Sequence, residues 1–454
     1  MPMIGPARLA AYDILSAVAA GRADLPAAIA LVRPALHDER DRALASDIAT
    51  GVQRWRAALD HLIAQCSKRS VERLDPEVVE ILRLSAYQLL HLTRVPASAV
   101  VDDAVDLTRR MGKPSAAGFV NAVLRTISRR RHGLPLPPRP ADPADRVAAL
   151  EYLSVTLSHP RWLVARWYER FGFDATEKWL RFDNLPAPLT LRANRVKLTP
   201  SELAALLERD GVRVTPGRFA PDALVVDEGH PLRGAGPAQG WFVVQDEASQ
   251  LVSVLAGPFL GPRVLDTCAS PGGKATALAA MMEGRGLLVA CDLRDRRVDL
   301  LRRTVAASGA SNVRVVQADL LESLPFSEPF DCVLVDAPCS GLGTLRRDPD
   351  IRWRRREADL AVFAAAQVEM LRHAGGSVAP GGRLVYATCS SEPEENEEVA
   401  NRFLETATDF AAVDARHRGT LLPAEVVDAR GHLRTSPHLH GLEAFFGAVF
   451  QRCP

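Results

Sequence analysis

The amino-acid sequence predicts a multidomain protein with an all-α N-terminal domain, a small α+β domain and a C-terminal α/β domain. Apolar residues recur at helical spacing from about residue 7 to residue 131. The next 14 residues, HGLPLPPRPADPAD, contain five prolines and separate this region from the rest. From residue 241 onward, short apolar strands alternate with helices, which predicts a parallel, doubly wound sheet. A chain of 454 residues is long enough for several such cores.

The predicted all-α domain covers residues 1–131. Asp75 followed by Pro76 predicts a helix start, with an N-cap and a proline at the first helical position. Residues 1–140 hold 20 Lys and Arg against 14 Asp and Glu, although the whole chain carries a net charge of only +1. This excess of positive charge favours contact with a polyanion. Residues 132–145 are predicted to form an extended, proline-stiffened linker.

Residues 146–240 mix helical stretches with short strand-like ones, such as PLTLRAN, GVRVT and ALVVD, and predict a small α+β domain. Within it, LRANRVK places Arg192, Arg195 and Lys197 on or beside one strand. The third domain covers residues 241–454. Its predicted strands are RVLD, GLLVACD, NVRVVQAD, FDCVLVD, GGRLVYAT and AFFGAVFQ.

Several protein classes are excluded by composition. No run of about 18 apolar residues could span a bilayer, and the opening residues lack the pattern of a secretory signal, so we expect a cytoplasmic protein without a membrane partner. The seven cysteines are odd in number, widely spaced and without a C-x-x-C pair. Neither a disulfide framework nor a structural metal site is therefore expected, and most of the thiols should be small buried hydrophobes.

The segment RVLDTCASPGGK has the order strand, glycine-containing loop, helix. Glycines allow close approach of a ligand to the backbone, and free N–H groups at a helix start attract negative charge. A phosphate loop is excluded because Ala275 stands where Ser or Thr is needed, and the dinucleotide pattern G-x-G-x-x-G is absent. The candidate cofactor residues in this loop are Cys268, Ala269, Ser270, Pro271, Gly272, Gly273 and Lys274.

Acidic residues end the two strands that follow. Asp292 lies about 20 residues beyond the loop, where a carboxylate can bind ribose hydroxyls, and Asp319 could bind an adenine edge. A nucleoside with a small charged tail suits this set better than a pyrophosphate does. Either acid could instead be a helix cap.

Two further predicted strands end in a cysteine. Asp336 and Cys339 follow FDCVLV, and Cys389 follows GGRLVYAT, so both thiols should face the crevice at the carboxyl ends of the strands. Cys332 lies inside its strand and is expected to be buried. A thiolate suits attack on carbon 6 of a pyrimidine, which makes carbon 5 able to accept a methyl group. Asp336 could hydrogen bond at N3, and Cys339 is placed to assist release.

The motifs CASPGGK, DAPCSG and ATCS, in this order, resemble those of the Sun family of RNA cytosine-5 methyltransferases. The resemblance implies a Rossmann-like class I methyltransferase domain that binds S-adenosyl-L-methionine through residues 268–274, Asp292, Asp319 and Asp336. It also implies that Cys389 is the nucleophile and that Cys339 aids product release.

The N-terminal segment VDDAVDLTRRMGKPSAAGFVNAVLRTI resembles the NusB-like RNA-binding domain of the bacterial small-subunit rRNA member of that family, the RsmB type. This resemblance implies 16S rRNA as the substrate. Three departures from the family pattern are Ser270, where Ala is usual, Asp348 in the arginine-rich loop, and Glu443–Ala444 near the end of the chain. The candidate RNA-binding residues are Arg129, Arg130, Arg131, Arg192, Arg195, Lys197, Arg346 and Arg347.

Four alternatives remain open at this point. The substrate could be tRNA or another RNA, or the chain could be an RNA-binding protein whose methyltransferase domain has decayed. A small-molecule or protein methyltransferase on the same fold would not need two cysteines at strand ends. A nicotinamide dehydrogenase would need the glycine pattern that is absent here.

Overall fold

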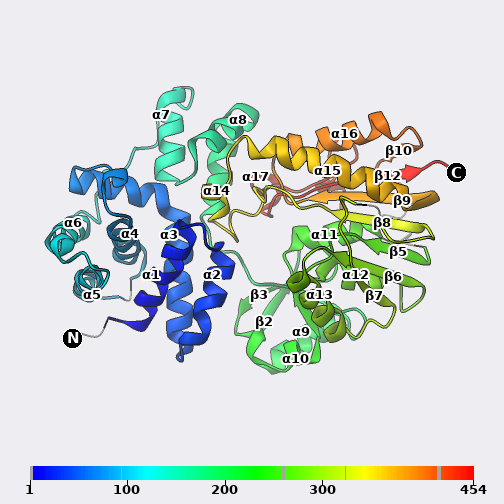
Figure 1. Cartoon of the computed structure of the whole chain (residues 1–454), viewed down its shortest axis with the longest axis horizontal. Coiled ribbons are helices and arrows are strands. Elements are labelled where there is room, and N and C mark those ends of the chain that lie inside the picture. The colour runs from blue at the N-terminus through cyan, green and yellow to red at the C-terminus, as the bar shows by residue number, and fades with distance from the viewer. Residues whose placement is uncertain (1–3, 94, 258–260, 323, 417–420) are drawn as a thin grey trace. The chain divides into compact units, whose positions relative to one another are not determined.

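The computed structural model of the protein describes residues 4–93, 95–257, 261–322, 324–416 and 421–454. Contacts within the chain divide it into two compact units (Figure 1). Unit 1 comprises Met1–Leu185 and Leu345–Arg355, and unit 2 comprises Pro186–Thr344 and Arg356–Pro454. Each unit has its own buried apolar cores.

Unit 1 is helical, as the sequence predicts for its N-terminal part. Its core is made by buried alanines, leucines and isoleucines of the first six helices, mainly α1, α3, α4 and α6. Gly51 allows α3 and α4 to approach, because a Cβ there would lie 2.0 Å from Cζ of Tyr87. The helices are α1 (Pro6–Ala19), α2 (Leu25–Val32), α3 (Glu39–Ser67), α4 (Pro76–His91), α5 (Ala97–Arg110), α6 (Ala117–Arg129), α7 (Arg146–Glu151), α8 (Arg161–Asp183) and α14 (Ile351–Arg354).

The helix start predicted at Asp75–Pro76 is confirmed, because α4 begins at Pro76. The carboxylate of Asp75 does not cap the helix, however. It forms an ion pair with Nζ of Lys113 at 2.9 Å instead. The proline therefore carries the start signal, since its missing N–H needs no partner in the first turn.

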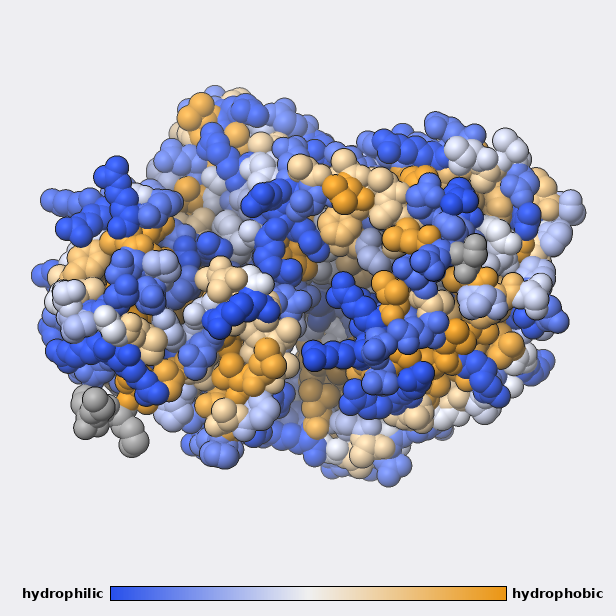
Figure 2. Space-filling view, in the orientation of Figure 1, coloured by the Kyte–Doolittle hydropathy of each residue, from blue (hydrophilic) through white to orange (hydrophobic). Residues whose placement is uncertain are grey.

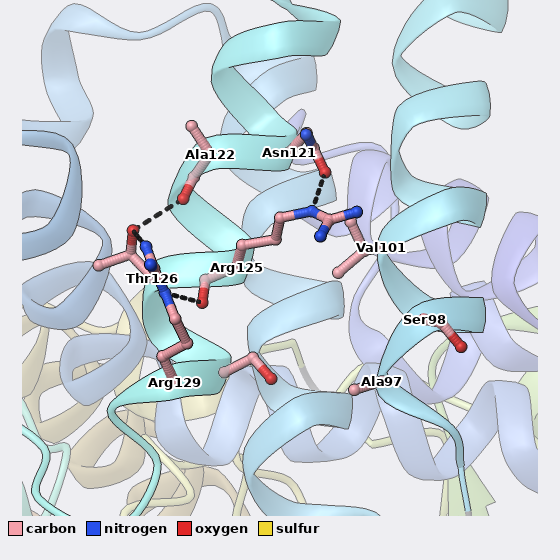
Figure 3. A pocket seen from close by; sticks show the side chains of 9 residues that line it. Ala97, Ser98, Val101, Asn121, Ala122, Arg125, Thr126 and Arg129 are labelled. Carbon is pink, nitrogen blue, oxygen red and sulfur yellow. Dashed lines mark hydrogen bonds between the residues drawn. The ribbon is translucent and has the colours of Figure 1, made fainter.

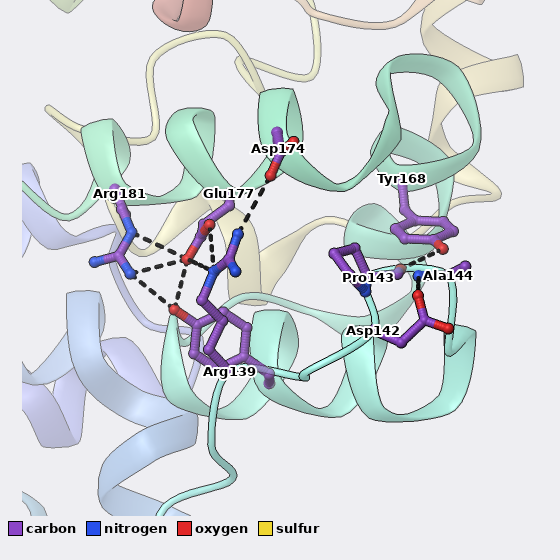
Figure 4. A network of polar contacts seen from close by, with 9 residues as sticks. Arg139, Asp142, Pro143, Ala144, Tyr168, Asp174, Glu177 and Arg181 are labelled. Atoms are coloured by element: carbon purple, nitrogen blue, oxygen red, sulfur yellow. Dashed lines mark hydrogen bonds and ion pairs between the residues drawn. The ribbon is translucent and has the colours of Figure 1, made fainter.

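The proline-rich segment 132–145 is fastened to unit 1. Arg139 donates to Glu177 and pairs with Asp174 (Figure 4). Its guanidinium also lies 4.8 Å from the ring centroid of Phe173. Backbone carbonyls of three of its prolines also accept hydrogen bonds from side chains of the helical unit. The segment is extended, as expected, but it is held along its length rather than being a free spacer.

Residues 146–185 group with unit 1, although the sequence suggests a middle domain over 146–240. They form α7, a π-helical turn (Tyr152–Thr156) and α8. Trp167, fully buried in α8, packs against Trp179 with tilted rings whose centroids lie 4.6 Å apart. Helical periodicity shows that these segments bury one face, but it does not show which core receives that face.

Residues 345–355 also belong to unit 1, although they are separated from its other residues along the chain. Arg352 is fully buried and donates to the carbonyl oxygen of Ser158 at 3.0 Å and to Oδ1 of Asn184 at 3.1 Å. Asp350, also fully buried, accepts from the backbone N–H of Leu25 at 3.1 Å. This insertion is therefore packed into the helical unit by polar contacts.

Unit 2 contains a four-stranded antiparallel sheet in the order β2-β3-β1-β4. The three strands predicted for the small domain are confirmed. A fourth strand, β4, was not predicted. Its residues fall within the predicted last domain, but it pairs with β1 and completes the small sheet. The elements are β1 (Thr190–Ala193), α9 (Pro200–Arg209), β2 (Arg213–Pro216), β3 (Ala223–Glu228), α10 (Gly236–Gln239) and β4 (Phe242–Val244).

The large sheet of unit 2 has the order β10-β12-β9-β8-β5-β6-β7, with β11 paired to β12. All six predicted strands are present. The expectation of a wholly parallel sheet holds from β9 to β7, but β12 runs antiparallel to β9, so the sheet is mixed. The strands are β5 (Arg263–Asp266), β6 (Leu287–Asp292), β7 (Val313–Gln317), β8 (Phe330–Asp336), β9 (Val378–Thr388), β10 (Phe410–Val413), β11 (Leu433–Arg434) and β12 (Phe446–Arg452).

Helices cover both faces of the large sheet (Figure 1). Side chains of α11, α12 and α13 pack on one face, and those of α15 and α16 pack on the other. The sheet is thus buried on both sides, which explains its nearly continuous apolar strands. The helices are α11 (Glu247–Ala256), α12 (Gly273–Met281), α13 (Asp295–Ser308), α15 (Asp359–Gly376), α16 (Glu397–Thr406) and α17 (Pro437–His440).

Across the described residues, no helix is both long and apolar enough to cross a membrane. On the face shown in Figure 2, hydrophobic residues lie scattered among hydrophilic ones.

Candidate active site

The predicted cofactor loop joins β5 to α12 at the carboxyl end of the sheet. Gly272 has φ of 107°, and a Cβ there would approach Thr304 to 3.0 Å, so glycine is required at this turn. Ser270 is nearly buried and donates its backbone N–H to Oδ2 of Asp292 at 3.1 Å. The loop thus leads into α12, whose first N–H groups have no partner within the helix.

Asp266, the last residue of β5, was not singled out by the sequence interpretation. It is fully buried, and no side chain among the described residues donates to its carboxyl oxygens. Burial and the nearby charge of Asp336 raise the pKa of Asp266 to about 7. An isolated buried carboxyl is costly unless a ligand cation or donor pairs with it. Its signal in the sequence was its position, since it ends the strand that precedes the glycine loop.

The two acids predicted to hold the nucleoside lie at successive strand ends. Asp292 is nearly buried, accepts from Ser270 and forms an ion pair with Nε of Arg297 at 3.2 Å. Asp319 is half-buried and accepts from the backbone N–H of Leu321 at 2.9 Å. Neither carboxylate caps α13, whose N-cap residue is Arg294.

Lys274 connects the cofactor loop with the predicted catalytic acid. Its Nζ lies 2.7 Å from Oδ2 of Asp336 and 3.1 Å from Oγ of Ser249 on α11. Burial opposes the charge of Lys274, but Asp336 outweighs burial and raises the pKa of this lysine. Cys389 lies close enough to contribute to the same shift. The ring centroid of Phe445 lies 5.8 Å from Nζ, which brings the end of the chain to the site.

The two cysteines predicted at strand ends lie side by side. Sγ of Cys339 is 3.3 Å from Sγ of Cys389, although 50 residues separate them in the chain. They meet because β8 and β9 are adjacent and parallel, so both strands end at the same edge. The hydrogen bond with Cys389, together with burial, raises the pKa of the Cys339 thiol well above its usual value. The Cys339 thiol can therefore act as a hydrogen-bond donor to the sulfur of Cys389.

Cys332 and Cys268 lie outside the pair of thiols formed by Cys339 and Cys389. Cys332 is fully buried in β8, as expected, and burial raises its pKa to about 12. Burial also raises the pKa of Cys268. No group of three or more His, Cys, Asp and Glu side chains suited to a metal ion occurs among the residues that the structure describes.

The predicted RNA-binding residues of the N-terminal region are exposed. Arg129, Arg130 and Arg131 follow one another at the end of α6 and are all exposed. Arg129 and Arg125 also line a cavity of about 610 Å³ between α5 and α6, with Asn121 and small polar side chains on its wall (Figure 3). This part of unit 1 therefore offers arginines to solvent.

The other predicted RNA-binding residues differ in exposure. Arg192 is 3% exposed and donates to Oε1 of Gln245 and Oγ1 of Thr276, so its guanidinium is occupied inside unit 2. Lys197 is exposed, but its Nζ contacts two backbone carbonyl oxygens. Arg195 pairs loosely with Asp222 at 3.7 Å. Arg192 lies within β1, whose four residues are all buried, whereas Arg195 lies beyond the end of this strand and is exposed.

Arg346 and Arg347 follow the cysteine loop and are half-buried in unit 1. The guanidinium of Arg346 lies 4.3 Å from the ring centroid of Phe182. Asp348, one of the departures from the family pattern, has its pKa raised to about 6 by burial and by Asp350. Of the other departures, Glu443 is buried, and Ala444 donates its N–H to the carbonyl oxygen of Gly343 at 2.9 Å.

The residues present fit S-adenosylmethionine. Its amino acid tail carries a carboxylate, which suits the free N–H groups at the start of α12. Its ammonium and sulfonium groups are cationic, which suits the unpaired carboxyl of Asp266. Such a loop at the carboxyl end of a doubly wound sheet, with acids ending the next two strands, defines the class of S-adenosylmethionine-dependent methyltransferases.

Comparisons with known proteins agree with this class. A family described as 16S rRNA methyltransferase RsmB/F matches residues 255–451, the NusB family matches residues 5–129, and an RsmF/B-like ferredoxin-like domain matches residues 159–233. The ribosomal RNA small subunit methyltransferase B of Pseudomonas putida is 36% identical over 87% of this chain and 88% of its own length. The chain belongs to the RsmB/F methyltransferase family.

Further similarities cover almost the whole chain. The ribosomal RNA small subunit methyltransferase B of Vibrio cholerae is 35% identical over 88% of this chain and 89% of its own length. The crystal structure of PH0851 matches with a TM-score of 0.79 and 27% identity, over 99% of both chains. The predicted NusB-like and methyltransferase parts are therefore present in one chain, and the predicted small α+β part overlaps the ferredoxin-like match.

Proposed function

We propose that this methyltransferase modifies carbon 5 of a cytosine in small-subunit ribosomal RNA, with Cys389 as the attacking nucleophile. The observation that carries the proposal is the pair of thiols 3.3 Å apart at the ends of β8 and β9, beside Lys274 and Asp336. Methylation of an amine or a hydroxyl needs no thiol nucleophile. A carbon that is a poor nucleophile does need one, because covalent attack splits a difficult step into two easier ones.

In the first step the sulfur of Cys389 forms a bond to carbon 6 of the ring. The electron pair of the 5,6 double bond then becomes available at carbon 5, and negative charge develops toward N3. The proton that the Cys389 thiol loses is shared between Asp336 and N3, which stabilises this charge, and it returns to Cys389 on release; Lys274 holds Asp336 in place at 2.7 Å.

S-adenosylmethionine, when bound, supplies the methyl group as an electrophile for carbon 5. The proton on carbon 5 then passes to water, its electron pair restores the 5,6 double bond, and the bond between sulfur and carbon 6 breaks. Cys339 assists this elimination. Its raised pKa keeps it protonated, so that its S–H can donate to the departing sulfur of Cys389.

The cofactor contacts are part of the same proposal. Residues 268–274 hold the amino acid tail, Asp292 the ribose and Asp319 the adenine edge, as their places at three successive strand ends suggest. The exposed arginines 129–131 and Arg195 contact phosphates, which supplies affinity but no sequence information. Arg346 and Arg347 lie close after Cys339 in the chain and are proposed to grip RNA near the target base.

Replacement of each cysteine tests the mechanism. Cys389→Ala should abolish methyl transfer to RNA, because no group adds at carbon 6, while S-adenosylmethionine binding measured by calorimetry persists. Cys339→Ala should instead accumulate a covalent RNA adduct, seen as a slowly migrating band in a denaturing gel. The exposed Cys453 offers a matched control, and Cys453→Ala should leave both readouts unchanged.

Bisulfite sequencing of ribosomal RNA from cells with and without the gene would locate the modified cytosine. Wild-type transfer by Cys389→Ala would contradict the mechanism. An adduct trapped by Cys389→Ala, and not by Cys339→Ala, would show that the two roles are reversed. Methylation of tRNA in place of ribosomal RNA would contradict the proposed substrate.

A further inference from the structure

A buried glutamate lies behind the two cysteine loops. Glu395, in the turn between β9 and α16, is fully buried, and no lysine or arginine among the described residues forms an ion pair with it. Its carboxylate is satisfied by hydrogen bonds from neutral groups. A carboxylate held in this way needs several donors at good distance, since each missing donor would leave a buried charge unpaired.

Three of the hydrogen bonds to the carboxylate of Glu395 come from the residues that directly follow the two cysteines. Ser340 donates its backbone N–H to Oε1 at 2.7 Å and its hydroxyl to Oε2 at 2.5 Å. Ser390 donates its hydroxyl to the same Oε2 at 2.5 Å. The two serine hydroxyls are 3.2 Å apart, so one carboxylate joins both loops at a single point.

Two further residues, Gln367 and Tyr386, hold Glu395 in place. Gln367 on α15 donates to Oε1 of Glu395 at 3.2 Å and to the carbonyl oxygen of Pro338 at 3.0 Å. The hydroxyl of Tyr386 on β9 donates to the backbone carbonyl of Glu395 at 2.6 Å. Glu395 therefore has few ways to move without moving the residues next to Cys339 and Cys389.

From this geometry we infer that Glu395 is a positioning residue, which sets the distance between the two thiols by clamping Ser340 and Ser390 together. The inference rests on the proposed function, because only a reaction that uses both thiols needs their separation fixed. Loss of the clamp should let the loops separate and weaken the hydrogen bond between the sulfurs. A displacement of about 1 Å at reacting groups can lower a rate by about 100-fold.

The test combines turnover with a direct measure of thiol proximity. A short bifunctional thiol reagent, dibromobimane, becomes fluorescent only when it bridges two neighbouring cysteines, and Cys389→Ala defines the background signal. Glu395→Ala should lower the bridging rate at least about 10-fold and kcat about 100-fold, with KM for RNA unchanged. Glu395→Gln should retain most of both, because the amide keeps one acceptor oxygen and can donate to the serine hydroxyls.

Glu398→Ala is the matched control, since this nearby glutamate is 45% exposed and makes only a 3.8 Å ion pair with Arg402. Binding of S-adenosylmethionine verifies that each variant is folded. If Glu395→Ala does not fold, Ser390→Ala removes a single donor, and the bridging rate should still fall several-fold. Wild-type bridging in every folded variant would overturn the inference, as would Glu395→Gln losing turnover with bridging intact.

These outcomes separate the inference from the proposed function. Bridging of the two thiols is measured without RNA and without methyl transfer. If no RNA cytosine is methylated, but bridging depends on Glu395, the proposed function fails while the clamp stands.

Discussion

Buried and exposed charges are used differently in the two units. In unit 2 the catalytic candidates are buried groups that contact one another, such as Lys274 with Asp336 and the two thiols. In unit 1 the arginines at the end of α6 are exposed. A buried charge acts on a neighbour through a low local dielectric, whereas an exposed one is screened by water and salt. This contrast suggests that unit 2 supplies the chemistry and that the arginines of unit 1 supply RNA affinity.

The largest expected effect concerns Asp266 in unit 2, a buried carboxyl to which no side chain among the described residues donates. The pKa of Asp266 is raised from 3.8 to about 7, so the folded protein binds a proton that the unfolded chain has released between these values. Stability therefore falls as pH rises from about 4 to 7, and the penalty is complete above 7. Asp266→Asn should remove a penalty of up to about 4 kcal/mol at pH 8, and little at pH 4.

Urea unfolding at the two pH values, followed by a probe in unit 2, measures this difference. S-adenosylmethionine should also bind the wild type more tightly as pH rises through 7, whereas the asparagine variant should bind weakly at both values. If the wild type and Asp266→Asn show the same pH dependence of unfolding, the pKa of Asp266 is not raised by burial. That result would contradict the contrast drawn between the two units.

Arg352 is an exception to this contrast between the units, because it is a fully buried charged residue in unit 1. Burial lowers its pKa to about 9, and it donates to carbonyl oxygens around Ser158 and Asp183. Arg352→Ala should destabilise unit 1 by about 3 kcal/mol, since several buried acceptors lose their donor. The exposed Arg129→Ala is the control and should change stability by less than about 0.5 kcal/mol. Similar melting temperatures for the two variants would contradict the structural role of Arg352.

The smallest expected effect on stability concerns the exposed arginines at the end of α6. Replacing Arg129, Arg130 and Arg131 together by Gln should leave unfolding almost unchanged, because these side chains are exposed. RNA binding should weaken, and the slope of log K against log salt should become shallower by about 2 to 3, one for each lost phosphate contact. RNA titrations at several salt concentrations measure this slope. An unchanged slope would assign the RNA surface to another part of the chain.

The catalytic candidates could be predicted from the sequence because parallel strands end at one edge. Once FDCVLVD and GGRLVYAT are recognised as neighbouring strands, Cys339 and Cys389 must lie close together. Asp266 and Glu395 could not be found in this way. Glu395 matters because distant segments donate hydrogen bonds to it, and Asp266 matters because no side chain does. Local sequence periodicity does not predict hydrogen bonds between distant segments.

The sequence could not predict which of the basic residues are exposed. Arg192 and Arg195 are three positions apart and look alike in sequence, yet Arg192 is occupied inside unit 2 and Arg195 is largely at the surface. Contacts within the chain group residues 146–185 with unit 1, whereas the sequence interpretation keeps residues 146–240 together. Residues 146–185 have an amphipathic pattern that shows burial, but only packing shows that they complete unit 1.

The insertion of residues 345–355 has a consequence for the order of folding. During synthesis the N-terminal part of a protein usually folds first, as a unit. Here unit 1 lacks Asp350 and Arg352 until about 160 residues of unit 2 have followed Leu185 out of the ribosome. Until then, the carbonyl oxygen of Ser158 and Oδ1 of Asn184 lack the hydrogen bonds that Arg352 donates in the complete fold. The segment that fills them emerges directly after Cys339, so the helical unit is completed only when half of the thiol pair has already been made.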